Sequence, residues 1–284
     1  MLGPMSVLSS NFIDAGGVRL HYLDGGEGAP VLLLHGWPTS SFLYRNVAPH
    51  IVAAGRRVIA VDLPGFGQSD KPLDASYSFK YFGGVLTAFL DALALPQVGL
   101  VVHDLGGPIG LHWMVSNPGR VTELALLNTL VYPRPSWAVV AFIAATYIPL
   151  VKGRLVSPWG LELAMKVGTS RAGAVTPELV AGVQAPFVDS AARKALLKTA
   201  QNLHPGGLGD IAEGLPAFEG PARIIYGTQD RILPDVARTM SRVAADMKLD
   251  PTQVTALPGC GHFLQEDRPD EIGQMLAEFF GGEP

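Results

Sequence analysis

An aspartate, Asp104, ends an apolar run and stands directly before glycines in the stretch Gly99-Leu-Val-Val-His-Asp-Leu-Gly-Gly-Pro108. A strand that ends at a polar residue and turns at once into a helix is typical of a nucleophile elbow. Gly106 supplies the small residue usual two places after the nucleophile, whereas Val102 departs from the pattern two places before it. A carboxylate is ionised at neutral pH and can displace a leaving group from a saturated carbon. We therefore predict a reaction that forms an alkyl ester on Asp104, which water then hydrolyses.

Two polar residues later in the chain complete this chemistry. Asp230 follows the apolar stretch 223–226, and His262 follows the apolar stretch 253–257. Parallel strands present their carboxyl ends to the same crevice, so residues just past those ends are expected to meet. The chain order of nucleophile, acid and histidine predicts His262 as the general base towards water and Asp230 as the residue that orients His262. The alternative for Asp104 alone is a cap for the following helix, a common role of aspartate.

Hydrolysis of an ester needs hydrogen-bond donors for the tetrahedral oxyanion. The backbone N–H of Leu105, directly after the nucleophile, is one predicted donor. The backbone N–H of Trp37 is the other, because the turn after His35-Gly36 is expected to lie beside the elbow. His103 precedes Asp104, and strand alternation points the two side chains in opposite directions. We therefore predict a structural role for His103.

Length and composition suit one α/β domain that carries an insertion, because 284 residues with 48% hydrophobic content can bury a large core. The net charge is -4 and the Lys and Arg residues are scattered, so no basic stripe is available for nucleic acid. The single cysteine, Cys260, excludes an internal disulfide, and no charged segment leads into an apolar one at the N-terminus. These features predict a cytoplasmic protein without a nucleic-acid partner, either a monomer or a weak dimer.

Alternating apolar strands and helices predict an α/β fold with a mostly parallel sheet and helices on both faces. Strands are expected at about 18–22, 30–35, 57–62, 99–104, 123–128, 222–227 and 253–257, after a frayed first segment. Helices are expected at about 42–52, 79–95, 109–116 and 269–280. Between 132 and 218 only helical patterns occur, among them 177–184 and 190–203. We predict a core of residues 1–131 and 219–284 and a helical cap of residues 132–218, whose inner face shapes a substrate cavity.

The stretch from Trp137 to Val151 has the composition of a membrane span. It is shorter than the ~20 apolar residues that a bilayer requires, and it contains Pro149. We predict a buried helix in a lid over the active site and no membrane span. A peripheral contact with a membrane is the alternative.

Four motifs carry a resemblance to a known family. They are His35-Gly-Trp-Pro-Thr-Ser-Ser-Phe-Leu-Tyr-Arg-Asn46, Asp62-Leu-Pro-Gly-Phe-Gly-Gln-Ser-Asp-Lys-Pro72, His103-Asp-Leu-Gly-Gly107 and Gly261-His-Phe-Leu-Gln-Glu-Asp267. Together they resemble the haloalkane dehalogenases and the closely related epoxide hydrolases of the α/β-hydrolase fold, over nearly the whole predicted core. The resemblance implies the nucleophile Asp104, the base His262, an acid at Asp230, and neither a cofactor nor a metal. The implied reactants are a small apolar organic substrate and water.

Two positions depart from this family. Haloalkane dehalogenases carry a tryptophan directly after the nucleophile, whose indole N–H holds the departing halide, and this chain has Leu105 there. Many also carry an asparagine directly after His-Gly, where this chain has Trp37. A leucine side chain offers no hydrogen bond, so the candidate indole donors are Trp37, Trp137 and Trp159. The favoured prediction is a haloalkane dehalogenase-like hydrolase that converts a carbon–halogen bond to an alcohol.

Alternatives follow from the same residues. An epoxide hydrolase needs a donor for the oxygen that leaves the carbon, which relatives take from cap tyrosines, and Tyr132 and Tyr147 are the candidates here. β-Lactone decarboxylases share the aspartate nucleophile and an Asn-Thr pair like Asn128-Thr129, although they too normally carry the tryptophan. The missing tryptophan also suggests a non-catalytic protein that holds an apolar small molecule. A serine esterase is disfavoured because no serine occupies the elbow.

Overall fold

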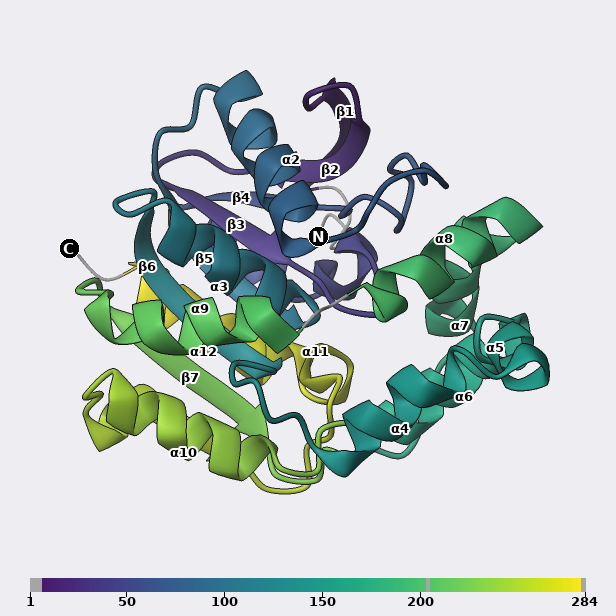
Figure 1. Cartoon of the computed structure of the whole chain (residues 1–284). Coiled ribbons are helices and arrows are strands. Elements are labelled where there is room, and N and C mark those ends of the chain that lie inside the picture. The colour runs from purple at the N-terminus through teal and green to yellow at the C-terminus, as the bar shows by residue number, and fades with distance from the viewer. Residues whose placement is uncertain (1–6, 203–204, 282–284) are drawn as a thin grey trace.

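The protein, described here by a computed structural model for residues 7–202 and 205–281, is built on one sheet of eight strands. The strands are β1 Ser9–Asp14, β2 Arg19–Gly25, β3 Pro30–Leu34, β4 Arg57–Val61, β5 Val98–Asp104, β6 Val121–Thr129, β7 Ala222–Gly227 and β8 Val254–Leu257. Their order across the sheet is β1-β2-β4-β3-β5-β6-β7-β8 (Figure 1). β2 runs antiparallel to both β1 and β4, and all strands from β4 to β8 in this order are parallel. The predicted α/β class is confirmed.

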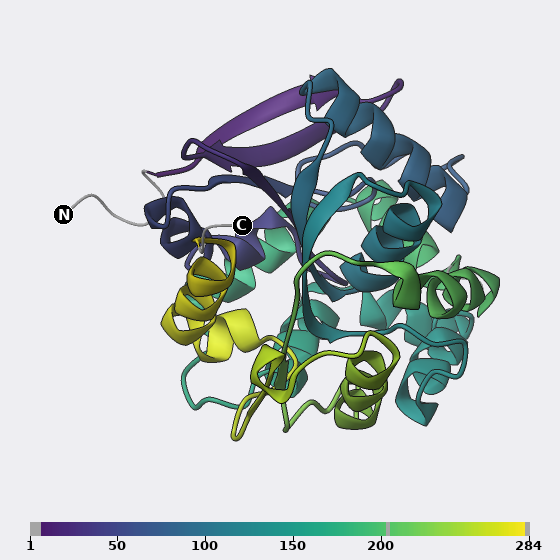
Figure 2. The same cartoon turned by 90° about the vertical axis from the view of Figure 1, so that its left-hand side faces the viewer.

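Helices cover both faces of this sheet. They are α1 Ala48–Ala53, α2 Phe79–Ala92, α3 Gly106–Ser116, α4 Trp137–Ala145, α5 Pro149–Leu155, α6 Pro158–Gly168, α7 Pro177–Gln184, α8 Ser190–Gln201, α9 Pro205–Gly214, α10 Val236–Asp246, α11 Leu264–Asp267 and α12 Pro269–Gly281. Short 3-10 turns are η2 Ser41–Tyr44, η3 Ala185–Phe187, η4 Leu215–Ala217 and η5 Pro251–Gln253. Figure 2 shows α12 on one side of the sheet and α2, α3 and α9 on the other.

Strand residues divide between two buried clusters. In β3, Leu32 and Leu34 pack into the cluster that contains residues of α2 and α3, whereas Val31 and Leu33 pack into the cluster of α1 and α12. This division arises because successive side chains of a strand point to opposite faces. With both faces covered, a central strand is apolar at every position, which is why the sequence shows continuous apolar runs instead of alternation.

Two predictions of local structure are wrong. Residues 9–14, expected to be frayed, form β1 and pair with β2 at the edge of the sheet. Their side chains are exposed or half-buried, so this strand has little apolar pattern to detect. The helix expected at 42–52 is divided into η2 and α1. Pro49 lies in the first turn of α1, the part of a helix where a residue without an N–H is tolerated.

The stretch from Trp137 to Val151 also differs from the single buried helix that was expected. It divides into α4 and the start of α5, which are bent by 106° relative to each other, with Pro149 in the first turn of α5. No residue of α4 or α5 is buried. No single helix in the described part of the chain is long and apolar enough to cross a membrane, although these two bent helices together have the length and composition of one span.

The described residues between β6 and β7 form helices and no strand. The helices α4 to α8 lie to one side of the sheet (Figure 1), and residues of α4, α5 and α6 share a cavity wall with Asp104 at the end of β5. In contrast, α9 packs against α3 on the sheet. The inserted segment therefore places a roof over the end of β5 and then returns to the sheet.

The first turn of α3 is packed tightly against β6, and this contact predicts a large effect of one added methyl group. A Cβ atom at Gly107 would overlap Thr129 Oγ1, the hydroxyl that donates to the Asp104 backbone carbonyl at 2.7 Å. We expect Gly107→Ala to lower the free energy of unfolding by roughly 1–3 kcal/mol, as overpacking does elsewhere, measured by urea denaturation. Gly209→Ala in α9 is the matched control, because no atom lies within 4 Å of the added Cβ there. An equal loss in both variants would contradict this packing.

Candidate active site

The turn between β5 and α3 holds Asp104 in a strained conformation. Asp104 ends β5 with a φ of 48°, and α3 begins two residues later. A positive φ is unfavourable for a residue with a side chain, and such strain is concentrated at functional sites. Val102, which departs from the small residue usual before an elbow, is accommodated by α3, since a Cβ atom at Gly110 would lie 2.8 Å from Val102 Cγ1. The small residue that the turn requires is therefore supplied by the helix.

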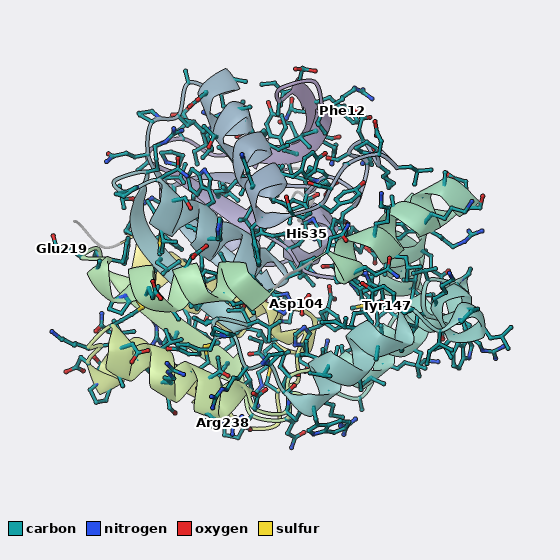
Figure 3. The ribbon with its side chains drawn as sticks, in the orientation of Figure 1. Phe12, His35, Asp104, Tyr147, Glu219 and Arg238 are labelled. Carbon is teal, nitrogen blue, oxygen red and sulfur yellow. The ribbon has the colours of Figure 1, made fainter. Side chains whose placement is uncertain are left out.

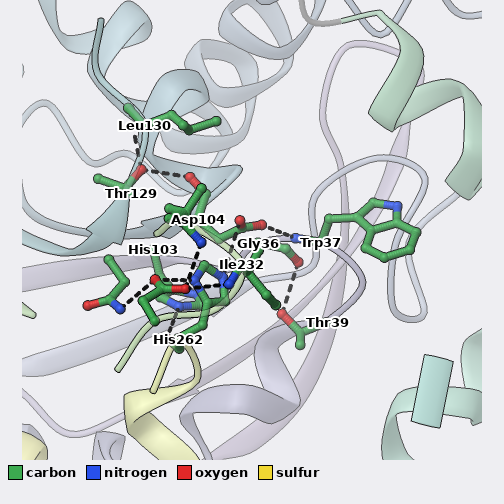
Figure 4. Close-up of polar contacts among 12 residues, drawn as sticks. Gly36, Trp37, Thr39, His103, Asp104, Thr129, Leu130, Ile232 and His262 are labelled. Carbon is green, nitrogen blue, oxygen red and sulfur yellow. Dashed lines mark hydrogen bonds and ion pairs between the residues drawn. The ribbon is translucent and has the colours of Figure 1, made fainter. Parts of the chain in front are cut away.

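Asp104, His262 and Asp230 lie in one continuous chain of polar contacts. Nε2 of His262 is 3.3 Å from Oδ2 of Asp104, and Nδ1 of His262 is 2.8 Å from Oδ2 of Asp230. Figure 4 shows the His262 ring below the Asp104 carboxylate. The His262 and Asp230 side chains are fully buried. The structure thus brings together the three residues that the sequence placed after three different strands.

Asp230 is held by donors that sequence reasoning did not assign. The Asn128 side-chain amide donates to Asp230 Oδ2 at 2.7 Å, while Asn128 Oδ1 accepts from the Gly227 N–H at 2.9 Å. The N–H groups of Ile232 and Leu233 donate to Asp230 Oδ1 at 2.8 and 2.7 Å. Asn128 could have been found from the sequence, because it lies at the carboxyl end of β6, where the other site residues also follow their strands. These bonds fix the carboxylate that orients His262.

The loop that carries His262 is anchored by a second buried carboxylate, Asp267, which also escaped the sequence reasoning. The Gly261 N–H donates to Asp267 Oδ2 at 2.6 Å. The N–H groups of Ser170 and Arg171, in the connection between α6 and α7, donate to Asp267 Oδ1 at 3.0 and 2.9 Å. The His262 loop is therefore joined directly to the inserted helices.

The charges of this site stabilise one another. Burial disfavours ionisation of Asp104, but the positively charged His262 ring, 3.3 Å away, outweighs burial and holds the pKa of Asp104 below its usual value. Burial likewise opposes ionisation of Asp230, and the His262 charge lowers the pKa of that carboxyl. Burial disfavours the charge on His262, yet the two carboxylates raise the pKa of His262 to about 10. At neutral pH the site therefore contains an imidazolium between two carboxylates.

His103 lies beneath this group with its ring centroid 4.8 Å from that of His262. Its Nε2 donates to the His262 backbone carbonyl at 2.9 Å. Burial lowers the pKa of His103 to about 4, and the His262 charge acts in the same direction. A neutral ring that holds the His262 backbone fits the predicted structural role.

The two predicted oxyanion donors already contact the nucleophile. The Trp37 N–H donates to Asp104 Oδ1 at 2.6 Å (Figure 4), and the Leu105 N–H helps to lower the pKa of this carboxyl. His35 supports the turn, because its Nε2 accepts from the Leu63 N–H at 3.1 Å and leaves Nδ1–H to donate to the Gly36 carbonyl at 2.9 Å. Burial lowers the pKa of His35, which keeps the ring in the neutral form that these bonds require.

Asp104 faces a cavity of about 660 Å³ between the sheet and the inserted helices. Its wall is almost entirely apolar and includes Pro38, Phe79, Leu130, Phe142, Ile143 and Leu233. The other charged side chains in the wall are Arg154 and Arg231. The cavity can enclose an apolar organic molecule of moderate size against the carboxylate. No group of three or more His, Cys, Asp or Glu side chains among the described residues is arranged to hold a metal ion.

The predicted indole donors for a leaving group lie in different places. Trp37 and Trp159 are in the cavity wall, whereas Trp137 is not and is 76% exposed. The indole of Trp37 points away from the Asp104 carboxylate (Figure 4), and its Nε1 donates to the Leu196 carbonyl at 3.3 Å. Trp159 is 53% exposed. The Trp37 indole must therefore leave its present partner before it can donate to a leaving group beside Asp104.

Neither tyrosine predicted to assist epoxide opening is in the cavity wall. The Tyr132 hydroxyl donates to Asp246 Oδ2 at 2.7 Å. The Tyr147 hydroxyl donates to the Gln201 carbonyl at 3.3 Å, and Figure 3 shows Tyr147 among the inserted helices, apart from Asp104. Both hydroxyls are thus engaged outside the cavity.

Known proteins are similar to this chain over most of its length. The family model for the alpha/beta hydrolase fold matches residues 29–269. A haloalkane dehalogenase from Mycolicibacterium paratuberculosis is 34% identical over 275 residues, which are 91% of this chain and 86% of the relative. A cis-3-alkyl-4-alkyloxetan-2-one decarboxylase from Shewanella oneidensis is 31% identical over 294 residues, covering 98% of this chain and 90% of the relative.

Solved structures agree. The crystal structure of the haloalkane dehalogenase DbeA from Bradyrhizobium elkani USDA94 matches with a TM-score of 0.84 and 28% identity, over 97% of this chain and 98% of that one. The family model matches most of the chain, and a haloalkane dehalogenase is 34% identical to it, so the family can be assigned. The chain belongs to the alpha/beta hydrolase fold family, among the relatives of the haloalkane dehalogenases.

Proposed function

We propose that the chain is a hydrolase of the haloalkane dehalogenase type, which cleaves a carbon–halogen bond of an apolar substrate through an ester of Asp104. One observation carries this proposal. The Asp104 carboxylate faces an apolar cavity, and its Oδ2 lies 3.3 Å from His262 Nε2. The reaction consumes the haloalkane and one water and yields an alcohol, a halide ion and a proton.

The first step is attack by Asp104 on the carbon that carries the halogen. The Trp37 N–H holds Oδ1 at 2.6 Å, so we assign the attack to Oδ2, the oxygen 3.3 Å from His262 Nε2. The new carbon–oxygen bond forms as the halide leaves with the electrons of the carbon–halogen bond. No base is needed, because the low pKa of Asp104 keeps it ionised.

Ester formation prepares His262 for the second step. The pKa of His262 is raised to about 10 because two carboxylates face it, and alkylation of Asp104 removes one of those charges. The imidazolium can then release its proton to solvent, and neutral His262 takes a proton from the water that attacks the ester carbonyl. The Trp37 and Leu105 N–H groups stabilise the oxyanion. Its collapse expels the alcohol, which receives the proton from His262, and Asp104 returns its own proton to His262.

A second candidate is the opening of a β-lactone, favoured by the β-lactone decarboxylase among the relatives, although Leu105 departs from that group as well. The leaving group of a lactone is a carboxylate that stays attached to the substrate, and ring strain assists its departure, so a dedicated halide site is not required. The oxetan-2-one named in the Shewanella relative is such a ring. The Asn128-Thr129 pair agrees with this candidate. An epoxide hydrolase has weaker support, since Tyr132 and Tyr147 lie outside the cavity wall.

The division of the chain also forms part of the proposal. Residues 132–218 serve as the cap and residues 1–131 and 219–284 as the core, which is supported by the contribution of α4, α5 and α6 to the cavity wall. Because α9 packs against α3, the helices α4 to α8 are the roof. A monomer or weak dimer, a cytoplasmic location and chemistry without a cofactor remain predictions from the sequence.

Trapping the ester tests the proposed function directly. We expect His262→Gln to form the Asp104 ester but to hydrolyse it slowly, because no base activates water. After incubation with 1-bromohexane, the intact-protein mass should increase by one hexyl group with the bromine lost. A β-lactone that instead adds its whole mass would favour the second candidate. The variant that also carries Asp104→Asn is the control and should gain nothing. No adduct with either reagent would contradict covalent catalysis by Asp104.

Because residue 105 is leucine and not tryptophan, we predict that restoring the tryptophan accelerates halide release. Leu105→Trp should place an N–H beside the departing halide and accelerate bromide release from 1-bromohexane in a single turnover. A hydrogen bond to a charged group contributes about 1.5–3 kcal/mol, which corresponds to roughly one to two powers of ten in rate. Leu105→Phe adds comparable aromatic bulk without an N–H and should give no such gain. Equal rates in the two variants would show that hydrogen bonding at residue 105 does not limit halide departure.

The change in His262 between the two steps can be measured without a substrate. Asp104→Asn removes the same charge as ester formation does, so we expect the pKa of His262 to fall below its value of about 10. A lower pKa means that His262 loses its proton at a lower pH. Titration of the ring nitrogens by nuclear magnetic resonance gives this value, and His103 in the same spectra provides a neutral internal reference. An unchanged His262 pKa would contradict the proposed role of the Asp104 charge.

A further inference from the structure

Helix α4 is apolar on every side, and no residue of it is buried. One side supplies Ala138, Val139, Phe142 and Ile143 to the cavity wall. The other side faces outward, where Trp137 is 76% exposed and Val140 is 54% exposed. A helix that is hydrophobic all round is normally enclosed by protein or by lipid. Helix α4 therefore lacks a partner on its outer side within the described part of the chain.

The apolar surface continues from α4 to α5 and α6. Nine of the thirteen exposed large hydrophobic side chains in the described residues lie between Trp137 and Val167. We call these nine the apolar face: Trp137, Val140, Tyr147, Ile148, Leu150, Val151, Trp159, Leu163 and Val167. Such a concentration within one segment of three consecutive helices is typical of an interaction site and differs from ordinary surface scatter.

The apolar face and the cavity wall share five residues. Leu150, Val151, Trp159, Leu163 and Val167 are both exposed and part of the cavity wall. On α6 the last three are spaced by four residues and so lie on one side of the helix. If an apolar environment covers the apolar face, a substrate can pass from it across these side chains to Asp104 without entering water.

The charged residues in the part of the chain that carries most of the apolar face are mostly basic. From residue 134 to residue 161 the chain contains Arg134, Lys152 and Arg154 and no acidic residue. The nearest following acid, Glu162, is paired with Lys166 at 2.6 Å. This local excess of positive charge contrasts with the net charge of -4 for the whole chain. The occupant of the face is therefore apolar with a negatively charged margin.

A second copy of the chain fits this description poorly. Two copies related by a two-fold axis would place the same face against itself, so Lys152 and Arg154 would meet positive charges. A lipid bilayer fits better, because tryptophan and tyrosine prefer the membrane interface and basic residues prefer anionic headgroups. With 9 residues, α4 is about 14 Å long, less than the ~30 Å of a bilayer core, and so would lie in the interface without spanning it.

We propose that the apolar face docks on an anionic lipid bilayer, with Lys152 and Arg154 among the headgroups and the cavity mouth open to the acyl chains. The bilayer would then deliver apolar substrates that dissolve in it. This proposal goes beyond the hydrolytic function and holds for either leaving group. Its test measures binding alone, so its failure leaves the proposed chemistry untouched.

Co-sedimentation of the full chain with lipid vesicles tests the proposal. We expect binding to equimolar phosphatidylcholine and phosphatidylglycerol, and weaker binding to phosphatidylcholine alone. Trp137→Glu with Leu150→Glu should reduce the partition coefficient by about tenfold or more, since both apolar anchors are replaced by charges that anionic lipid repels. Both side chains are exposed, so the fold should persist, which circular dichroism checks. Lys152→Gln should weaken binding only to the anionic vesicles.

Phe12→Glu is the matched control, because Phe12 is 41% exposed on β1, far from Tyr147 of the apolar face (Figure 3). Binding by this variant should equal that of the unmodified chain. Failure of the unmodified chain to sediment with either vesicle would overturn the proposal, as would equal losses in the control. Sedimentation equilibrium provides a further check. A dimer that the Trp137 and Leu150 substitutions dissociate, without any vesicle binding, would assign the face to a second copy and overturn the proposal as well.

Discussion

The protonated ring of His262, held between two buried carboxylates, is the interaction on which the rest of the site depends. A single buried charge would be strongly unfavourable, and three alternating charges in contact offset this cost for one another. Asp104 keeps its ionised form because His262 is there, and His262 keeps its proton because Asp104 and Asp230 are there. In the proposed reaction, ester formation removes the charge of one member of this group. Once Asp104 is esterified, the balance changes, and the same ring that stabilised the nucleophile becomes able to activate water.

Most of the surrounding structure serves to hold these charges at fixed distances. Asn128 joins the Asp230 carboxylate to the backbone of β7, and Thr129 ties its hydroxyl to the backbone carbonyl of Asp104. Asp267 does the same for the His262 loop and extends the support to the connection between α6 and α7. These groups come from the carboxyl ends of adjacent strands and from the roof. A displacement of the roof is therefore coupled mechanically to the position of the base.

Local sequence patterns were sufficient for the parts of the site that lie at strand ends. Asp104, Asp230 and His262 each follow an apolar run, and the parallel sheet aligns the ends of those runs. Other features depend on contacts between distant residues and left no local signal. The Tyr132 hydroxyl is engaged by Asp246, which is 114 residues away in the chain. The exposure of α4 could not be predicted, because its apolar composition indicates burial unless the absence of a covering element is known.

The residue after the nucleophile contributes to the two halves of the reaction through different atoms. The backbone N–H of Leu105 is assigned to hydrolysis of the ester and is the same for every amino acid except proline. Its side chain, only 4% exposed and in the cavity wall, occupies the position proposed to face the group that departs first. Variation at this one position can therefore change which bond is broken while the machinery that releases the product stays intact. A change of leaving group is in this sense confined to a single side chain, because the N–H at the same position does not depend on which residue stands there.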